Sequence, residues 1–141
     1  MHGPLVALRT PEGSLNMKVS KATASKVNDM GVAEDRTEEF DGYTVNFVSI
    51  RQDADLAPML KGLPDDRCQC PHWGYVFKGK MTVRYADHDE VIGPGEAFYI
   101  PPGHTPAADA GTEFVQFSPT DELAISEAVM AKNMQEMQGG G

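Results

Sequence analysis

Residues 68–106 read CQCPHWGYVFKGKMTVRYADHDEVIGPGEAFYIPPGHTP, and this stretch decides the fold of the chain. Alternating side chains over 73–78 and 80–86 predict two adjacent strands joined by a tight turn. The Gly-Pro-Gly sequence at 93–95 is typical of another tight turn, and a further short strand follows over 97–100. The stretch therefore predicts short strands with tight turns that close on a Pro-Pro-Gly-His corner.

The chain on either side of this stretch carries the same kind of pattern. Residues 43–51 (YTVNFVSIR) alternate over a whole strand, and residues 112–118 (TEFVQFS) predict a last one. Residues 17–23 alternate weakly, which predicts a strand at a sheet edge. The acidic residues 28–41 are predicted to form a loop in which 38–40 can be extended. Roughly seven to nine short strands with closely spaced turns favour a barrel or sandwich over a βαβ fold.

The end of the chain predicts a helix. The sequence SPTD at 118–121 combines an N-cap, a proline in the first turn and an acid that complements the helix dipole. We expect one domain, because 141 residues can bury a single apolar core. Its predicted parts are a flexible N-terminal arm over 1–16, a β-barrel over 17–118, a C-terminal helix over 119–138 and a disordered tail over 139–141.

Charge and composition exclude several classes of partner. The formal net charge is −9 and the 12 Lys and Arg residues are scattered, so nucleic acid and anionic membrane surfaces are not expected partners. No apolar run approaches the roughly 20 residues of a membrane span. The apolar patch at 5–8 is too short for the core of a signal peptide. We therefore expect a cytoplasmic protein.

Residues 95–103 (GEAFYIPPG) resemble the second signature motif of the cupins, a family of small β-barrels. That motif is a Gly, five residues, Pro-x-Gly, two residues and a His. The position of its His is held here by Pro106, and His104 stands two residues earlier. The resemblance covers about residues 43–118. It implies an all-β fold, a cupin-type double-stranded β-helix (jelly-roll barrel), to which this chain adds its C-terminal α-helix.

The first signature motif of that family is present as a frame with substituted ligands. It reads His-x-His, three or four residues, Glu, six residues, Gly. Anchored on Gly79, the frame places His72 at the Glu position, Cys68 at the second His position and Asp66 at the first. The resemblance thus implies a metal site at these positions, built from different side chains, and it carries no substrate.

Four side chains form the candidate metal site. Cys68, Cys70 and His72 project to one face if this segment is extended, and His104 arrives from the second motif. Thiolates and imidazoles suit Zn²⁺ or Fe²⁺ better than a hard cation. Pro71 can introduce a bulge that turns Cys70 away. The competing interpretation is that the thiols are buried core residues and the imidazoles are merely hydrogen-bonded.

Other side chains suggest a pocket and a subunit contact. Tyr99 and Gln116 are polar residues within strands and are candidate pocket groups. If His72 faces the barrel interior, alternation sends three aromatic residues to the opposite face, which we interpret as a subunit contact: Trp73, Tyr75 and Phe77. Because the edge strands of the barrel need cover, we expect a homodimer.

Two functions of different classes fit this sequence. The first is a metal-dependent enzyme in which a divalent metal polarises a small organic substrate or O₂. The second is a non-catalytic small-molecule-binding or sensor protein without bound metal. Other chemistries lack support, since the sequence has no Walker or Rossmann fingerprint and no nucleophile elbow. Whether the protein is an enzyme stays open at this point.

Overall fold

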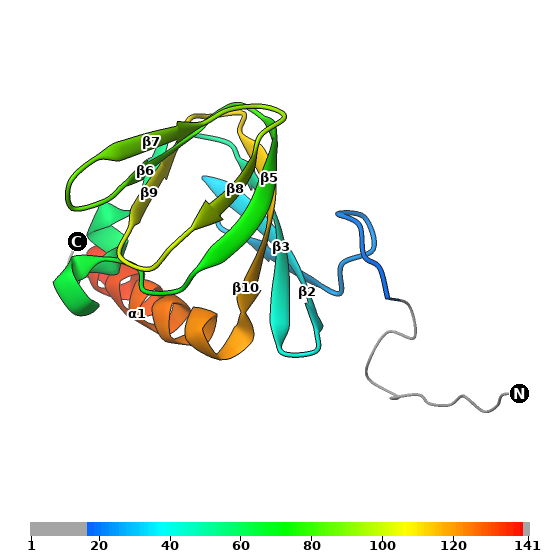
Figure 1. Cartoon of the computed structure of the whole chain (residues 1–141). Coiled ribbons are helices and arrows are strands. Elements are labelled where there is room, and N and C mark those ends of the chain that lie inside the picture. Colours follow the sequence, from blue (N-terminus) through cyan, green and yellow to red (C-terminus); the bar gives the residue numbers. More distant parts are fainter. Residues whose placement is uncertain (1–16, 140–141) are drawn as a thin grey trace, which may run out of the picture.

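Residues 17–139 are described by a computed structural model, in which two antiparallel β-sheets enclose a barrel and a long helix lies against its end (Figure 1). The strands are β1 (Lys26–Asp29), β2 (Ala33–Phe40), β3 (Tyr43–Ile50), β4 (Ala54–Asp55), β5 (His72–Lys78), β6 (Met81–Arg84), β7 (Asp89–Ile92), β8 (Ala97–Ile100), β9 (Thr105–Ala108) and β10 (Glu113–Pro119). The six-stranded sheet has the order β1-β2-β3-β10-β5-β8, and the four-stranded sheet has the order β4-β9-β6-β7. This arrangement confirms the predicted all-β fold class.

The main apolar core lies between the two sheets. On β8, Phe98 and Ile100 are buried while Ala97 and Tyr99 are exposed, which is the period-two pattern of a strand with one face on the core. The buried members of this core come from both sheets: Val76, Met81, Val83, Ile92, Phe98, Ile100 and Phe114. Their burial holds the sheets face to face and positions the strand ends that carry the candidate site.

Helix α1 (Thr120–Gly139) follows β10 directly and lies across one end of the barrel, at the bottom of Figure 1. Acidic residues occupy its first turn, where the positive end of the helix dipole stabilises them. Further along, the side-chain amide of Asn133 donates to the carbonyls of Met59 (2.6 Å) and Lys61 (2.9 Å). These bonds fix the helix to the segment that precedes β5, and the helix confirms the C-terminal helix of the predicted fold class.

A second apolar cluster lies between α1 and the segment before β5. That segment forms two short 3₁₀ helices, η2 (Ala57–Leu60) and η3 (Pro64–Asp66). The buried members of the cluster are Leu60, Leu63, Cys68, Cys70 and Leu123. Both cysteines are therefore buried where the barrel meets the helix.

The structure corrects the prediction for the first strands. Residues 17–23 contain no strand, and the predicted loop over 28–41 instead contains the end of β1 and all of β2. Within it, only 38–40 are predicted to be extended, and they form the end of β2. β2 carries charged side chains on both faces, so it shows no apolar alternation. Glu34 pairs with Arg36 on one face (Oε1 to Nε, 2.7 Å), and Asp35 points to the other. Polar partners and the ladder to β3, rather than an apolar face, hold this strand.

The turn between β2 and β3 explains why the two strands form a hairpin. Phe40 and Tyr43 pair directly, so Asp41 and Gly42 form a two-residue loop. Their φ angles are 48° and 82°, and a type I′ turn requires positive φ at both positions. Asp-Gly is the residue pair that such a turn favours.

The predicted arm over 1–16 lies outside the described residues, as do residues 140–141 of the predicted tail. Gly139, the first residue of that tail, is the last residue of α1. Within 17–139, no helix has the length and apolar character that crossing a membrane requires.

Candidate metal centre

Two loops bring Cys68 and His104 together at the end of the barrel that α1 covers. Cys68 follows η3, and His104 immediately precedes β9. The Cys68 N–H donates to the His104 carbonyl at 2.9 Å, and the His104 N–H donates to the Cys68 carbonyl at 3.2 Å. Residues paired in this reciprocal way present their side chains on the same face. The main chain therefore sets the approach of these two side chains.

His72, the first residue of β5, completes a cluster of three buried side chains. The Sγ of Cys68 lies 3.8 Å from Nε2 of His72. The rings of His72 and His104 meet edge to face, with centroids 5.1 Å apart. One potential ligand atom from each of the three residues lies within 4.8 Å of the others. A tetrahedral metal ion can take three protein ligands in this way and keep a fourth position open.

The imidazole of His104 is held in one tautomer. Its Nδ1–H donates to the Pro101 carbonyl at 2.7 Å, so the lone pair lies on Nε2. This Nε2 is buried and has no hydrogen-bond partner among residues 17–139. Burial lowers the pKa of His104, although the bond to Pro101 opposes the shift. An unpaired buried nitrogen is costly, and a neutral imidazole with a free lone pair is the form that binds a metal.

His72 is oriented by a hydrogen bond to the neighbouring strand. Its Nδ1 lies 2.7 Å from Oγ of Ser118 on β10, and this contact turns Nε2 towards Cys68. Burial lowers the pKa of His72 to about 3, and the proximity of His104 contributes further. Both rings of the cluster are therefore neutral near neutral pH. Hydrogen bonds to the outer ring nitrogen commonly orient metal-binding histidines in this way.

Helix α1 covers the cluster and completes its polar surroundings. Oγ of Ser126 lies 3.3 Å from Sγ of Cys68, and Ser126 itself is buried. The donors are one sulfur and two imidazole nitrogens. This set fits Zn²⁺ or Fe²⁺, whereas Ca²⁺ and Mg²⁺ prefer oxygen ligands.

Cys70 and Asp66 lie outside the cluster, although the sequence places both at or near ligand positions. The Sγ of Cys70 lies 3.4 Å from the Pro71 carbonyl, and the residue belongs to the apolar cluster beside α1. Burial raises the pKa of Cys70 to about 12, and the nearby thiol of Cys68 adds to the shift. Asp66 is exposed and accepts a hydrogen bond from the Gly62 N–H at 3.0 Å. The structure brings together three of the four predicted metal ligands.

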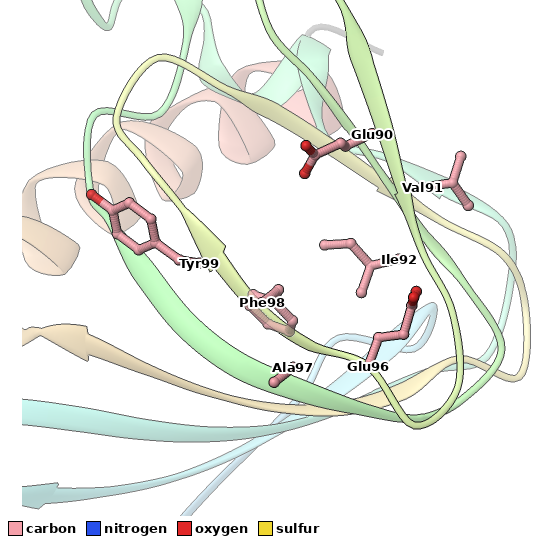
Figure 2. A pocket seen from close by; sticks show the side chains of 7 residues that line it. All are labelled: Glu90, Val91, Ile92, Glu96, Ala97, Phe98 and Tyr99. Carbon is pink, nitrogen blue, oxygen red and sulfur yellow. The ribbon is translucent and has the colours of Figure 1, made fainter.

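The two predicted pocket residues lie apart from each other. Gln116 pairs with Gly74 and shares the interior face of β10 with Ser118. Tyr99 is 52% exposed on the outer face of β8. Tyr99 lines a cavity of about 300 Å³ between β7 and β8, shown in Figure 2, whose lining residues are Glu90, Val91, Ile92, Glu96, Ala97, Phe98 and Tyr99. None of the three clustered residues lines this cavity, so it is a separate feature.

Sequence reasoning misses two residues that contact the cluster, Ser118 and Ser126. Ser118 stands two positions after Gln116 in a strand, so alternation places both on the same interior face. That signal is present in the sequence. The sequence contains no comparable signal for Ser126, because its contact with Cys68 depends on how α1 docks against the barrel.

The lowered pKa of His72 predicts how the stability of the metal-free protein changes with pH. The pKa is about 3 in the folded protein and 6.5 ordinarily, so between these values the unfolded chain binds a proton that the folded protein does not. Stability therefore falls as pH falls through this window, by about 1.4 kcal/mol per pH unit from this group. Chelated protein unfolded in urea at about pH 7 and about pH 5 measures the slope.

The pH dependence of the wild-type stability is compared with that of two variants. His72→Gln should reduce the slope by about one proton, while His88→Gln should leave it almost unchanged. His88 is exposed and beside Asp87, which raises its pKa. Its contribution to the slope has the opposite sign, and it is small because solvent screens an exposed pair. Equal slopes in the wild type and His72→Gln would show that His72 is not buried as a neutral ring.

No family model and no curated protein matches the sequence. Several solved structures have the same fold as this chain. An RmlC-like cupin from Shewanella frigidimarina is 16% identical with a TM-score of 0.51, and the match covers 74% of this chain and 91% of that one. A protein of unknown function from Rhizobium leguminosarum is 20% identical with a TM-score of 0.54, covering 72% and 93%.

The polyketide cyclase RemF from Streptomyces resistomycificus is 17% identical with a TM-score of 0.55, and the match covers 75% of this chain and 80% of that one. Identities this low support a statement about the fold alone. They agree with the two-sheet barrel and with the resemblance of residues 95–103 to a cupin motif. The chain has the fold of the cupin superfamily.

Proposed function

We propose that Cys68, His72 and His104 bind one divalent metal ion, Zn²⁺ or Fe²⁺, and that this ion serves small-molecule chemistry. The observation that carries the proposal is Nε2 of His104. This nitrogen is buried, bears the lone pair and lacks a partner among residues 17–139, yet it lies beside a thiol and a second imidazole. A metal ion would satisfy all three groups at once.

Each group has a defined part in such a site. Cys68 would supply a thiolate, and the two imidazoles would supply their Nε2 atoms. Ser118 and the Pro101 carbonyl would hold the rings in orientation from the outer side. When bound, the ion supplies a Lewis acid that polarises an oxygen-containing group of the substrate. Burial of the cluster strengthens electrostatic interactions there, because water is excluded.

The proposed function is a metal-dependent enzyme that acts on a small organic molecule. Three protein ligands leave one coordination position for substrate or water, which is the arrangement of catalytic rather than structural zinc sites. RemF, which shares this fold, is named as a polyketide cyclase, so the fold can support an enzyme. The reaction types compatible with the resemblance to cupins include oxygenation, isomerisation and lyase chemistry.

A second function, non-catalytic binding of a small molecule, is favoured by the cavity between β7 and β8. Ile92 and Phe98, which are buried, line this cavity together with the carboxylates of Glu90 and Glu96 (Figure 2). Within the described part of the chain, neither glutamate forms an ion pair. A ligand with an apolar body and a positively charged group fits this lining.

Metal analysis separates the two functions. Protein purified without a nickel column is expected to contain about one Zn or Fe per chain. Chelation is expected to lower the Tm by about 10 °C. A ligand present at about 1,000 times its Kd stabilises a protein by about 4 kcal/mol, and each kcal/mol is worth roughly 2–4 °C in a chain of this size.

Variants identify the ligands in the same assay. The double variant Cys68→Ser, His72→Ala is expected to lose the metal. Cys70→Ser is the matched control and is expected to retain it, because Cys70 lies outside the cluster. Circular dichroism establishes that each variant is folded. Wild-type protein that is metal-free, with a Tm unchanged by chelation, would favour the binding function of the cavity instead.

A further inference from the structure

The interior face of the six-stranded sheet changes from apolar to polar along β3 and β10, which lie side by side (Figure 1). Val48 on β3 pairs with Phe114 on β10, and both pack in the main apolar core. The next two pairs on this face, towards α1, carry polar side chains instead. We call their members the polar rows: Asn46 with Gln116, and Thr44 with Ser118.

The row next to α1 has its hydrogen-bond partners within the chain. Oγ1 of Thr44 lies 2.8 Å from Oγ1 of Thr120, at the start of α1. Oγ of Ser118 lies 2.7 Å from Nδ1 of His72. Buried polar groups are normally paired in this way. These contacts also join the polar rows to the helix and to the candidate metal centre.

Asn46, in the other row, has incomplete hydrogen bonding. Its side chain is buried, with 2% exposure, and its Nδ2 donates to both carboxylate oxygens of Asp35 on β2, at 3.0 Å each. An ionised carboxylate only accepts, so the amide oxygen points away from Asp35. This Oδ1 is buried and has no hydrogen-bond partner among residues 17–139. A buried acceptor without a donor is costly, and we therefore expect a donor from outside the chain.

The surroundings of Asn46 are acidic. Burial raises the pKa of Asp35, although the bond from Asn46 opposes the shift. On α1, partial burial raises the pKa of Glu127, and the nearby carboxylates of Asp35 and Glu39 add to the shift. Lys26 acts in the opposite direction, but it forms no ion pair within the described part of the chain. Neighbouring carboxylates of this kind favour a cation over a neutral donor.

We propose that Oδ1 of Asn46 and the carboxylate of Asp35 bind a primary ammonium group of a small molecule. An ammonium group has three N–H donors and no acceptor, so it matches two neighbouring acceptors. Hydrogen bonds with a charged donor or acceptor are roughly twice as strong as neutral ones. Asp35 and Gln116 are only partly buried, so the polar rows are not sealed from solvent.

The ammonium site lies on the same interior face as the candidate metal centre. Asn46 is on β3 and His72 on β5, and both strands are neighbours of β10. Two strand spacings, about 10 Å, therefore separate the two strands, and an amine with a chain of several carbon atoms spans such a distance. The inference rests on the proposed function in that it names the substrate class. The substrate would carry a primary amine at one end and an oxygen-containing group for the metal at the other.

The test follows the side-chain amide signals of Asn46 by NMR while n-butylammonium is added to the full chain, as purified and again after chelation. We expect the signals to shift and to saturate in both preparations. n-Butanol should bind at least about 10-fold more weakly, because it lacks the charge. Asp35→Asn should weaken binding of n-butylammonium by about 10-fold or more, since it removes the ionised acceptor. Glu127→Gln should weaken it in the same direction and takes the place of Asp35→Asn should that variant fail to fold.

Glu38→Gln is the matched control. Glu38 lies on β2 like Asp35, but alternation puts it on the opposite face, so the same loss of charge should leave the affinity for n-butylammonium unchanged. Equal affinities for n-butylammonium and n-butanol overturn the ammonium site. Wild-type affinity in the folded Asp35→Asn protein, or in Glu127→Gln where it takes its place, also overturns it. A protein that binds the amine but holds no metal would contradict only the proposed function, and a metal-bound protein whose Asn46 signals do not respond would contradict only the ammonium site.

Discussion

Replacing His104 with alanine is expected to lower the affinity for Zn²⁺ by more than about 100-fold. Nε2 of His104 is one of three converging donors and has no other partner within residues 17–139. Loss of an outer hydrogen-bond partner of a metal ligand costs 10- to 100-fold, so loss of a ligand itself should cost more. The bridge to Cys68 uses main-chain atoms and survives the change. Competition with a chromophoric chelator measures the affinity.

Two further variants are compared with His104→Ala, one with a smaller expected loss of Zn²⁺ affinity and one with none. Ser118→Ala removes the hydrogen bond that orients His72 and leaves the three ligands themselves in place, and we expect a loss of about 10- to 100-fold. Cys70→Ser should bind Zn²⁺ as the wild type does. Circular dichroism and urea unfolding establish that each protein is folded. A folded His104→Ala protein with wild-type affinity would show that His104 is not a ligand.

Gly74→Ala is expected to reduce the free energy of unfolding by about 3 kcal/mol or more. Gly74 lies on β5 between β10 and β8, on the interior face. A Cβ atom there would collide with the Val115 carbonyl oxygen and with the Phe98 ring, whose Cε2 would lie 2.9 Å away. The carbonyl belongs to a paired strand, and the ring packs against Phe114 in the core, with centroids 6.3 Å apart. Neither can retreat without disturbing the barrel.

Gly93→Ala is the control for that experiment. Within 4 Å of a Cβ atom at this position lies only Glu96 Oε1, at 3.7 Å, and the backbone is not left-handed. We expect a change within about 0.5 kcal/mol. Urea unfolding with equal m-values compares the two variants. A Gly74→Ala protein as stable as the wild type would mean that β5, β8 and β10 do not pack as described.

The barrel could be predicted because its turns leave a mark in the sequence. Gly79 and Gly95, which anchor the two cupin frames, have φ angles of 76° and 83°. This left-handed region favours glycine, so the positions of the glycines in the sequence indicate where the turns lie. β2 left no such mark along its length, since a strand with charges on both faces lacks alternation. The Asp-Gly turn that follows it was the available signal.

Part of the candidate site could be predicted, because the spacing of the cupin frame and strand alternation identify its ligands. Cys68, His72 and His104 follow from the ligand positions of the cupin frame and from alternation, and the structure brings them together. Alternation does not apply to Cys70, because residues 69–71 are not in a strand and β5 begins at His72. Ser126 could not be predicted, since it reaches Cys68 only after α1 has docked.

X-ray absorption at the zinc or iron edge of the protein as purified tests the proposed site most directly. The proposed site predicts one sulfur neighbour, at about 2.3 Å for zinc, with nitrogen or oxygen neighbours at about 2.0–2.1 Å. The sulfur neighbour should vanish in Cys68→Ser and persist in Cys70→Ser. A wild-type spectrum with two sulfur neighbours, or with none, would contradict a site built from Cys68, His72 and His104.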